Sequence, residues 1–466
     1  MREKKTTPKR GRQEAEAAAP AKKRPAYPAY CRELGTNGEG IVKNPVGKTV
    51  FVKYLLPGER GTVAAVKELK SYDIGRVETL ETASLSRVEP PCPVFKSCGG
   101  CQLQHMDYAA EAAFKRELVE KTLFKVAGLA AAVRPLVLSP LAYRYRNKLS
   151  MPIRAGRDGA PVIGFFRERT HEVVPVEDCL LQPEWNRTLI ALTRRYLTES
   201  GCPAYAETGA RAGARHLVAR EAAGRLTVTL VTAAPERLDG YFALLRGAFP
   251  AVSLYNNVND TENNVIFGRD FRLIGETGTL ADELHPAAFY QVNDSVSRRL
   301  YRDAVKLADP KDAVVVDAYS GGGLMTAMLA KSALRAYGVE IDPAAHADAL
   351  RLKARERLDN MTPILGDCRD ALPKILQNEA GARIVPVLDP PRKGCDAAVL
   401  HAVLRRSADI PRIVYISCNP ATLARDLGIL SAAYRLTLVR PYDMFPKTAN
   451  VETLAALTLS RPLSPK

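Results

Sequence analysis

Strand and helix patterns alternate from about residue 293 to the C-terminus, and this alternation restricts the fold more than any other feature. Apolar residues fall at helical spacing behind an Asn293–Asp294 cap. Short apolar runs typical of buried strands then recur between helical stretches, at 313–317, 335–340, 362–365, 384–388, 413–417, 436–440 and 451–460. The pattern predicts a doubly wound α/β sheet over residues 289–466. The short connection between the last two strands predicts that they form an antiparallel pair.

The sequence before residue 289 divides into three further segments. Residues 1–26 mix Lys, Arg, Pro, Ala and Glu with almost no large apolar residue, which is typical of a disordered basic arm. In residues 27–89, glycines separate short β-type runs, which predicts a small OB-like β-barrel. Residues 90–288 are predicted to form an antiparallel β-rich central domain with few helices, whose strands lie at 148–154, 162–167, 225–231 and 265–274.

Charge and apolar content narrow the classes of function. Across 466 residues, 67 Lys and Arg stand against 51 Asp and Glu, so the formal net charge is +16. This excess indicates an anionic partner, nucleic acid first, although a basic surface that binds nothing is the alternative. No apolar run approaches the ~20 residues of a membrane span and no signal-peptide core is present, so we expect a cytoplasmic protein. Nine cysteines in a reducing compartment then indicate metal binding, catalysis or burial rather than disulfides.

Three of these cysteines form a tight loop. Cys92, Cys98 and Cys101 follow a Cys-x5-Cys-x2-Cys pattern interrupted by proline and a Gly-Gly pair. Three thiolates need a fourth ligand to complete a cluster or a tetrahedral site, and Cys179 is the best candidate. The ligand set alone does not decide between an iron–sulfur cluster and zinc. His105 is a further candidate ligand, although we expect a solvated histidine there.

Acidic residues stand at the ends of successive predicted strands. Asp317 precedes the glycine-rich turn Ala-Tyr-Ser-Gly-Gly-Gly, where glycines let a nucleotide-like ligand approach the backbone. Glu340 ends the second strand and could accept hydrogen bonds from ribose hydroxyls. Asp367 and Asp389 follow the third and fourth strands. Helix capping is the alternative role for Asp317 and for Asp367.

Cys418 follows the fifth predicted strand and precedes a turn into a helix. Ligands of open α/β sheets bind at this edge, and a helix N-terminus can lower the pKa of a thiol. A buried cysteine that acts as a small apolar residue is the alternative. A dinucleotide oxidoreductase would share the glycine turn, but it would need neither Cys418 nor the Asp-Pro-Pro sequence at Asp389.

Several motifs, taken in order, resemble the RNA uracil-5-methyltransferase family. They are Phe289-Tyr-Gln-Val-Asn293, the turn 317–323, Asp389-Pro-Pro-Arg-Lys-Gly394, Ser417-Cys-Asn-Pro420, and Phe445-Pro446 followed by Val451-Glu452-Thr453. The resemblance covers residues 28 to the end and implies a C-terminal class I methyltransferase domain that uses S-adenosylmethionine. Residues 35–42 resemble a TRAM domain, a small RNA-binding barrel. This barrel and the cysteine loop are similar to the 23S ribosomal RNA branch, whose [4Fe–4S] cluster implies Cys92, Cys98, Cys101 and Cys179 as ligands, with zinc as the alternative.

The resemblance also implies roles for single residues. Cofactor contacts match Gln291, Tyr319, Glu340 and Asp389, with Asp367 near the adenine. Cys418 matches the nucleophile and Glu452 the base. Thiolate addition to carbon 6 of uracil makes carbon 5 nucleophilic, and a base must later remove the proton from carbon 5. The target uridine must leave its stack to reach such a site. Arg425 or Arg392 is expected to stabilise the enolate or to contact phosphate.

The sequence departs from the family at two places. Lys447 and the pair Ala449–Asn450 stand where many relatives have histidines, and Ser320 stands where Cys is common.

The expected substrate is a 23S rRNA uridine in a loop, and the expected state is a monomer. The alternatives are a tRNA uracil-5-methyltransferase, a cytosine-5-methyltransferase and a non-catalytic RNA-binding ribosome-assembly factor.

Overall fold

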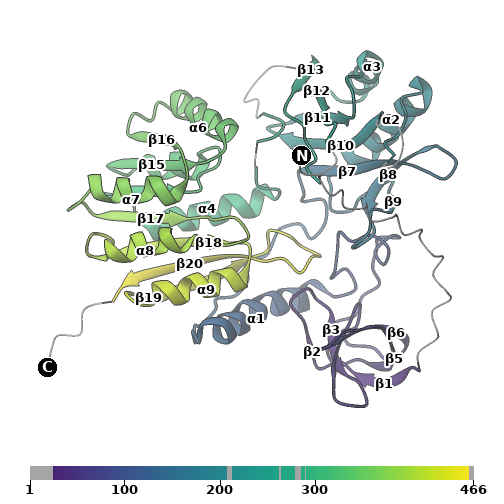
Figure 1. The fold of residues 1–466 in the computed structure, drawn as a ribbon, viewed down its shortest axis with the longest axis horizontal. Coiled ribbons are helices and arrows are strands. Elements are labelled where there is room, and N and C mark those ends of the chain that lie inside the picture. The colour runs from purple at the N-terminus through teal and green to yellow at the C-terminus, as the bar shows by residue number, and fades with distance from the viewer. Residues whose placement is uncertain (1–24, 207–211, 262–263, 279–284, 289, 461–466) are drawn as a thin grey trace, which may run out of the picture. The chain divides into compact units, whose positions relative to one another are not determined.

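The computed structural model describes residues 25–206, 212–261, 264–278, 285–288 and 290–460. The chain forms two compact units, one of residues 25–35 and 39–84 and one of residues 36–38 and 85–460 (Figure 1). Apart from residues 25 and 26, the predicted basic arm lies outside the described residues. In the described part of the chain, no helix combines the length and the apolarity that crossing a membrane requires.

The first unit is built from strands alone. Its sheet follows the order β1-β5-β6-β4-β3-β2 around a small apolar core that includes Val42, Val50 and Val63. Most pairs are antiparallel, whereas β4 and β6 are parallel. The bounds are β1 Tyr27–Tyr30, β2 Glu33–Leu34, β3 Gly40–Lys43, β4 Thr49–Val52, β5 Arg60–Glu68 and β6 Asp73–Thr82.

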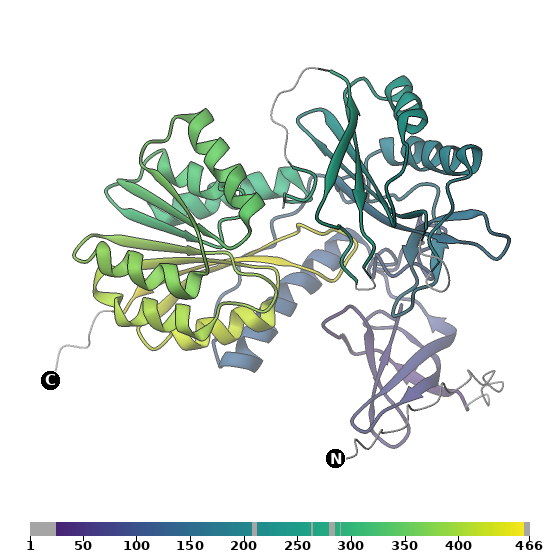
Figure 2. The same cartoon turned by 45° about the horizontal axis from the view of Figure 1, so that its top comes forward.

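The second unit contains a central sheet with the order β13-β12-β11-β10-β7-β8-β9. Apolar residues of α2 and α3 pack on it, and Figure 2 shows both helices beside its strands. The sheet is mainly antiparallel, as predicted, but β11 and β12 are parallel. Strands β10 and β12 and helices α2 and α3 were not predicted. The bounds are β7 Lys148–Ala155, β8 Pro161–Phe166, β9 Val173–Pro175, α2 Trp185–Ser200, β10 Ala214–Ala222, β11 Arg225–Thr232, α3 Asp239–Ala248, β12 Val252–Val258 and β13 Phe271–Glu276.

The C-terminal sheet follows the order β16-β15-β14-β17-β18-β20-β19. Strands β14 to β18 are parallel, and β20 runs antiparallel to both β18 and β19, which confirms the predicted antiparallel closing pair. Its strands are β14 Val314–Ala318, β15 Arg335–Glu340, β16 Met361–Leu365, β17 Ile384–Leu388, β18 Arg412–Ser417, β19 Tyr434–Tyr442 and β20 Glu452–Leu459.

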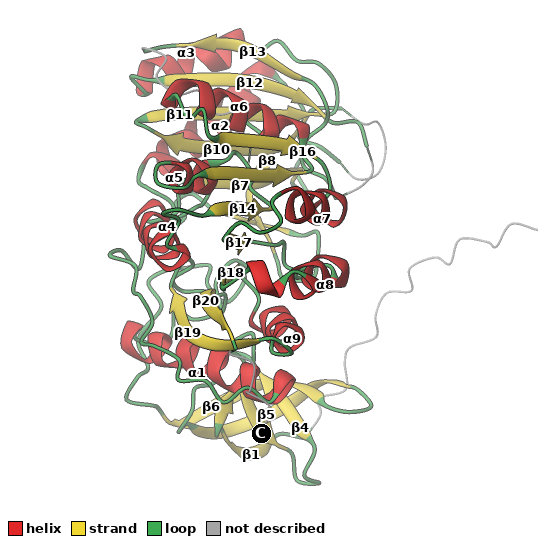
Figure 3. Cartoon of the chain, turned by 90° about the vertical axis from the view of Figure 1, so that its left-hand side faces the viewer, coloured by secondary structure: helices red, strands yellow, loops and turns green. Residues whose placement is uncertain are grey.

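Helices cover both faces of this sheet, which confirms the predicted doubly wound α/β fold (Figure 3). One face packs against α4, α5 and α6, and the other against α7, α8 and α9. The bounds are α4 Asp294–Ala308, α5 Leu324–Ala330, α6 Pro343–Glu356, α7 Cys368–Asn378, α8 Ala397–Arg405 and α9 Pro420–Leu430, with a 3₁₀ turn at Ser407–Asp409. The predicted cap of α4 is present, because the Asn293 side chain accepts a hydrogen bond from the Val296 N–H.

Helix α1 (Tyr108–Ala127) and the segment after it pack against the C-terminal sheet. The side chain of Asp107 caps its first turn, and Gly128 ends it at φ 65°. Val119 and Leu123 are buried in the same apolar core as α9, together with Val133. Parallel β-bridges join Val133 to Val439 and Val137 to Tyr442, both of which belong to β19. Residues 107–137, which the sequence groups with the central domain, therefore complete one end of the C-terminal core.

Candidate active site

The C-terminal sheet brings the expected nucleophile and base to one edge. Cys418 follows β18 and Asp389 follows β17, so both lie where parallel strands end. Glu452 begins β20, which runs antiparallel to β18 with Ser417 opposite Thr453. The first residue of an antiparallel strand lies at the same edge as the last residues of its parallel neighbours. Cys418, Asp389 and Glu452 therefore project from three adjacent strands.

These three groups are close enough to change one another's ionisation. Burial and then the Glu452 carboxyl raise the pKa of the Cys418 thiol to about 11, against the opposing effect of the Arg392 cation. Burial and the Asp389 carboxyl hold the pKa of Glu452 well above its usual range. Burial and the Asp317 carboxyl raise the pKa of Asp389 to about 7. Strongly shifted groups that share one edge are typical of catalytic sites.

Hydrogen bonds to the main-chain carbonyl of Arg392 hold this residue beside Cys418. The Arg392 carbonyl accepts hydrogen bonds from Asn419 Nδ2 at 3.1 Å and from Thr422 Oγ1 at 3.3 Å. Both donors belong to the turn and helix that follow Cys418. The two motifs thus fix each other's position, and the guanidinium lies near enough to oppose the negative charge of Cys418 and Glu452.

Arg425, the other arginine named for this role, is held by a carboxylate and two main-chain carbonyls. Its Nη2 lies 2.6 Å from Asp426 Oδ1 and donates to the carbonyls of Lys393 and Cys395, both at 3.1 Å. Asp426 also accepts the Cys395 N–H at 2.8 Å and the hydroxyl of Tyr415. Arg425 and Asp426 therefore hold the loop after Asp389 in place through hydrogen bonds to its main chain. The sequence contained no signal that singles out Asp426.

The turn after β14 has the backbone that a close ligand approach requires. Tyr319 and Gly323 adopt positive φ angles of 68° and 80°. A Cβ on Gly323 would stand 2.8 Å from that of Ala349, so glycine is needed there. Glu340 spans the turn, because its carboxylate accepts the N–H of Gly321 and that of Asp342, each at 2.8 Å.

Two other predicted acids occupy contrasting settings. Asp317 is buried and accepts the Thr326 hydroxyl at 2.6 Å, and burial raises its pKa to about 7. Asp367 caps α7 by accepting the Arg369 N–H, and its carboxylate lies 2.7 Å from Arg369 Nη2. This contact lowers the pKa of Asp367. The capping role left open for Asp367 is thus present, and Asp317, although it lies within β14, also accepts a hydrogen bond from the main chain of Thr326 in the first turn of α5.

Gln291 lies beside the same edge, although Phe289 of its motif falls outside the described residues. Its carbonyl accepts Asn147 Nδ2 at 2.9 Å, and its Nε2 lies 3.5 Å from the hydroxyl of Tyr301. Burial, and the charge of Asp389 after it, raise the pKa of Tyr301. Gln291 is therefore placed from two sides, by the central domain and by α4.

The four predicted cluster ligands are neighbours. Burial raises the pKa of Cys101 to about 12 and that of Cys179 to about 11, and the other thiols of the set contribute to both shifts. All four are partly exposed and have free thiols. Within the residues that the structure describes, no group of three or more His, Cys, Asp or Glu side chains is placed to hold a metal ion. His105 is buried beside Phe95 rather than solvated.

Known proteins similar to this chain agree on one activity. The model of the tRNA (Uracil-5-)-methyltransferase family matches residues 376–460. An uncharacterized RNA methyltransferase of Halalkalibacterium halodurans is 37% identical and covers 95% of this chain and 98% of its own length. One from Clostridium tetani is 35% identical, over 94% of this chain and 97% of its own.

A solved structure gives the same result for the fold. The Pyrococcus abyssi tRNA (uracil-54, C5)-methyltransferase in complex with S-adenosyl-L-homocysteine matches 92% of this chain and 99% of its own, with a TM-score of 0.73 and 25% identity. The doubly wound sheet is therefore a class I methyltransferase domain. From its relatives and its fold, the chain belongs to the RNA uracil-5-methyltransferase family of S-adenosylmethionine-dependent enzymes.

Proposed function

We propose that this enzyme methylates carbon 5 of a specific uridine in 23S ribosomal RNA through a covalent adduct with Cys418. The observation that carries the mechanism is the placement of Cys418, Asp389 and Glu452 at adjacent strand ends. The substrate class is supported by the first β-unit, which resembles a TRAM domain, and by the cysteine loop. Both features are typical of the 23S branch.

In this mechanism the Cys418 thiolate adds to carbon 6 of the flipped uracil and forms a carbon–sulfur bond. The electron pair displaced from the ring makes carbon 5 nucleophilic. Carbon 5 then forms a bond to the methyl group that S-adenosylmethionine would supply when bound, and the electron pair of the broken methyl–sulfur bond would stay on the sulfur. Glu452 then takes the proton from carbon 5, and the carbon–sulfur bond breaks to restore the thiolate of Cys418.

The electrostatics of the edge suit these steps. Arg392 is the cation that opposes the burial of Cys418, so it favours the thiolate. Burial makes an ionised Glu452 a stronger base than an exposed glutamate would be, because its pKa is raised. Gln291, Tyr319, Glu340 and Asp389 are proposed to hold the cofactor. Asp367 is proposed to lie near its adenine.

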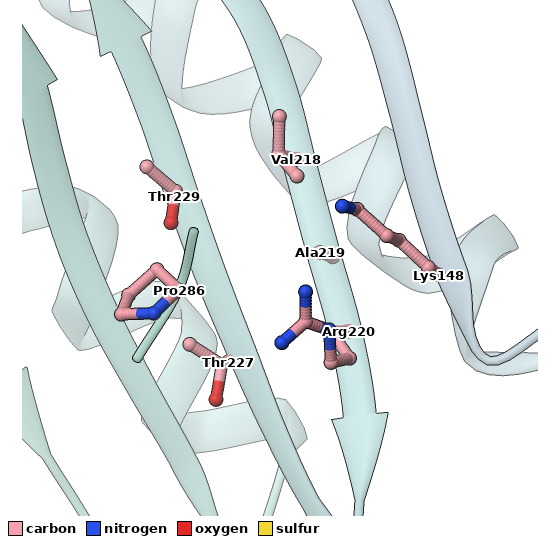
Figure 4. A pocket seen from close by; sticks show the side chains of 7 residues that line it. All are labelled: Lys148, Val218, Ala219, Arg220, Thr227, Thr229 and Pro286. Atoms are coloured by element: carbon pink, nitrogen blue, oxygen red, sulfur yellow. The ribbon is translucent and has the colours of Figure 1, made fainter. Parts of the chain in front are cut away.

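Two cations of the central sheet lie at one small cavity, which is too small for a phosphate group. Figure 4 shows Lys148 of β7 and Arg220 of β10 at one small cavity, which Thr227, Thr229 and Pro286 also line. Burial and the charge of Arg220 lower the pKa of Lys148 to about 8. Arg220 is buried and donates to the Ala288 carbonyl, so it is held by the protein rather than presented to RNA. In the preceding segment 143–148, where aromatic and cationic residues are interleaved, Arg144 is paired with Asp178 at 2.6 Å.

We further propose that Cys92, Cys98, Cys101 and Cys179 hold a [4Fe–4S] cluster. The donors are four thiols, three from one loop and one from a separate segment, and charges within the set contribute to the raised pKa values of Cys98, Cys101 and Cys179. Zinc is the alternative for this donor set. The absorption and electron paramagnetic resonance spectra of protein purified without oxygen, with iron and zinc analysis, decide between them. Cys202→Ser serves as the control that keeps the metal.

A second candidate substrate is transfer RNA, because the solved relative from Pyrococcus abyssi is a tRNA enzyme and matches 92% of this chain. The deciding experiment maps 5-methyluridine in ribosomal and transfer RNA from cells that lack the gene and from complemented cells. Loss of one 23S position alone supports the proposal. Loss of a tRNA position would transfer the assignment to tRNA.

A further inference from the structure

The loop that leads to Glu452 is fixed by a lysine with an unusual environment. Lys447 lies between β19 and β20, five positions before Glu452, with a positive φ of 66° and a side chain only 5% exposed. Its Nζ lies 3.1 Å from Glu111 Oε2 and 5.1 Å and 5.7 Å from the ring centroids of Tyr108 and Tyr143. A desolvated ammonium held by a carboxylate and two aromatic rings is strongly oriented.

The main chain of Lys447 is held as firmly as its side chain. The Lys447 N–H donates to Glu111 Oε1 at 2.7 Å, and its carbonyl accepts the N–H of Gln102 at 3.1 Å and that of Leu103 at 3.0 Å. Gln102 Oε1 also accepts the N–H of Ala449 at 3.3 Å. Gln102 directly follows Cys101, so the loop before Glu452 and the end of the cysteine loop share one set of hydrogen bonds.

The start of the same loop is tied to α1 by a second lysine. Lys115 Nζ lies 2.8 Å from Glu111 Oε1 and 2.7 Å from Asp443 Oδ1, and it donates to the Phe445 carbonyl at 3.1 Å. Two carboxylates and two ammonium groups thus form one buried set, which we call the loop anchor: Glu111, Lys115, Asp443 and Lys447. The anchor holds both the beginning and the middle of the segment 443–451.

We propose that Lys447 is a positioning residue that fixes the approach of Glu452 to carbon 5 and couples it to the segment after Cys101. The inference rests on the proposed role of Glu452 as the base. Lys447 touches no reacting atom in this account and acts through the loop. Cys418 follows β18, outside the loop, so a disturbed anchor is expected to impair proton removal more than thiolate addition.

The test uses 23S rRNA or tRNA, whichever the wild type methylates, transcribed with uridine or with 5-fluorouridine. A fluorine on carbon 5 cannot be removed as a proton, so the adduct with Cys418 persists whether or not Glu452 is well placed. Adduct yield on 5-fluorouridine RNA therefore counts enzyme with a working nucleophile. Turnover and adduct accumulation on uridine RNA report the final step.

For Lys447→Met, we expect an adduct yield on 5-fluorouridine RNA within about twofold of wild type. We expect kcat on uridine RNA to fall on the order of 10²-fold, the effect of a displacement of about 1 Å at a reacting centre. Adduct should accumulate on uridine RNA, as it should for Glu452→Gln. Lys121→Met removes a 2.8 Å ion pair of α1 that is exposed, and it should match wild type in each measurement.

Gln102→Leu provides a second variant in case Lys447→Met does not fold. Gln102 is partly exposed, and the change removes one bond to the loop, so we expect the same pattern with a drop in kcat of about tenfold. Wild-type turnover in the folded variants, or a parallel loss of turnover and 5-fluorouridine adduct in both, would overturn the inference. Absence of any adduct with the wild type would instead overturn the proposed function.

Discussion

One set of buried charges holds the loop before Glu452 and another surrounds Glu452 itself, and the two sets are built in opposite ways. In the loop anchor, each carboxylate lies within 3.1 Å of an ammonium group. At the catalytic edge, burial and the Asp389 carboxyl raise the pKa of Glu452, and the Arg392 cation offsets this only in part. Paired buried charges hold structure in place, whereas a buried acid whose pKa stays raised lowers stability when it ionises. Pairing is incomplete even in the anchor, since burial still raises the pKa of Asp443.

The largest effect is expected at the nucleophile. Cys418→Ala should lower methyl transfer from radiolabelled S-adenosylmethionine to RNA on the order of 10⁴-fold or more, because no other group can form the adduct. Thermal stability should change little, since Cys418 is partly exposed. Retention of even a tenth of wild-type activity would place the chemistry elsewhere.

The same substitution at two buried glutamates compares the two sets directly. Glu111→Gln should lower the free energy of unfolding by about 3 kcal/mol, because it leaves the two lysines of the anchor short of a negative partner. Glu452→Gln should raise it at pH 8, because the neutral amide removes the cost of an ionised buried acid, while activity falls on the order of 10²-fold or more.

Denaturant unfolding at pH 8 and methylation assays check both glutamate variants. The sign follows from linkage: an acid whose folded pKa is raised binds its proton more tightly in the folded state, so its ionisation at high pH destabilises the fold. If both variants changed the free energy of unfolding in the same direction, the contrast between the paired anchor and the catalytic edge would be wrong.

Asp317 extends the comparison to pH. Its pKa rises to about 7 from an ordinary value of 3.8, so its contribution to stability should decline as pH increases from about 4 to about 7. Asp317→Asn should therefore stabilise the protein at pH 8 by a few kcal/mol, on the order of 2–4, and have little effect at pH 4. Unfolding curves at both pH values measure this. A gain that does not depend on pH would show that ionisation is not its cause.

The smallest effect is expected at Asp367, which is paired as in the anchor but is exposed to solvent. Asp367→Ala should cost about 1 kcal/mol of stability through loss of the α7 cap, and Asp367→Asn should retain most of it. Calorimetric titration with S-adenosylmethionine separates the two roles. If Asp367 also contacts the cofactor, both variants should bind S-adenosylmethionine more weakly than wild type. If only Asp367→Ala binds it more weakly, Asp367 acts as a helix cap alone.

Local patterns predicted the catalytic edge well. The strand before Cys418 was predicted at 413–417 and spans Arg412–Ser417, because a short apolar run between breakers admits few other structures. The central domain was predicted less well. Strand β12 contains Asn256 and Asn257, which suggest a turn, yet both are buried and their side chains donate to neighbouring main-chain carbonyls. Strand β10 likewise carries Arg215 and Arg220, which only the folded neighbours keep buried.

The loop anchor was beyond sequence reasoning for a different reason. Lys447 was noted only as a departure from the family, and no local feature of the sequence singles out Glu111 or Lys115. Their partners lie more than 300 positions away in the chain, so no local period or spacing reveals them. The contacts of Arg425 could not be predicted for the same reason, because the carbonyls it binds belong to a loop about thirty residues earlier.

The packing of α1 on α9 has a consequence for biosynthesis. Helix α1 emerges from the ribosome early, but the apolar surface of Val119 and Leu123 finds its cover only when the last elements of the chain have been made. That surface must stay shielded in the meantime, and the central sheet must fold while the enclosing core is incomplete. Expression of residues 289–466 alone should therefore yield an aggregation-prone fragment, because it lacks the helix that seals one end of its sheet.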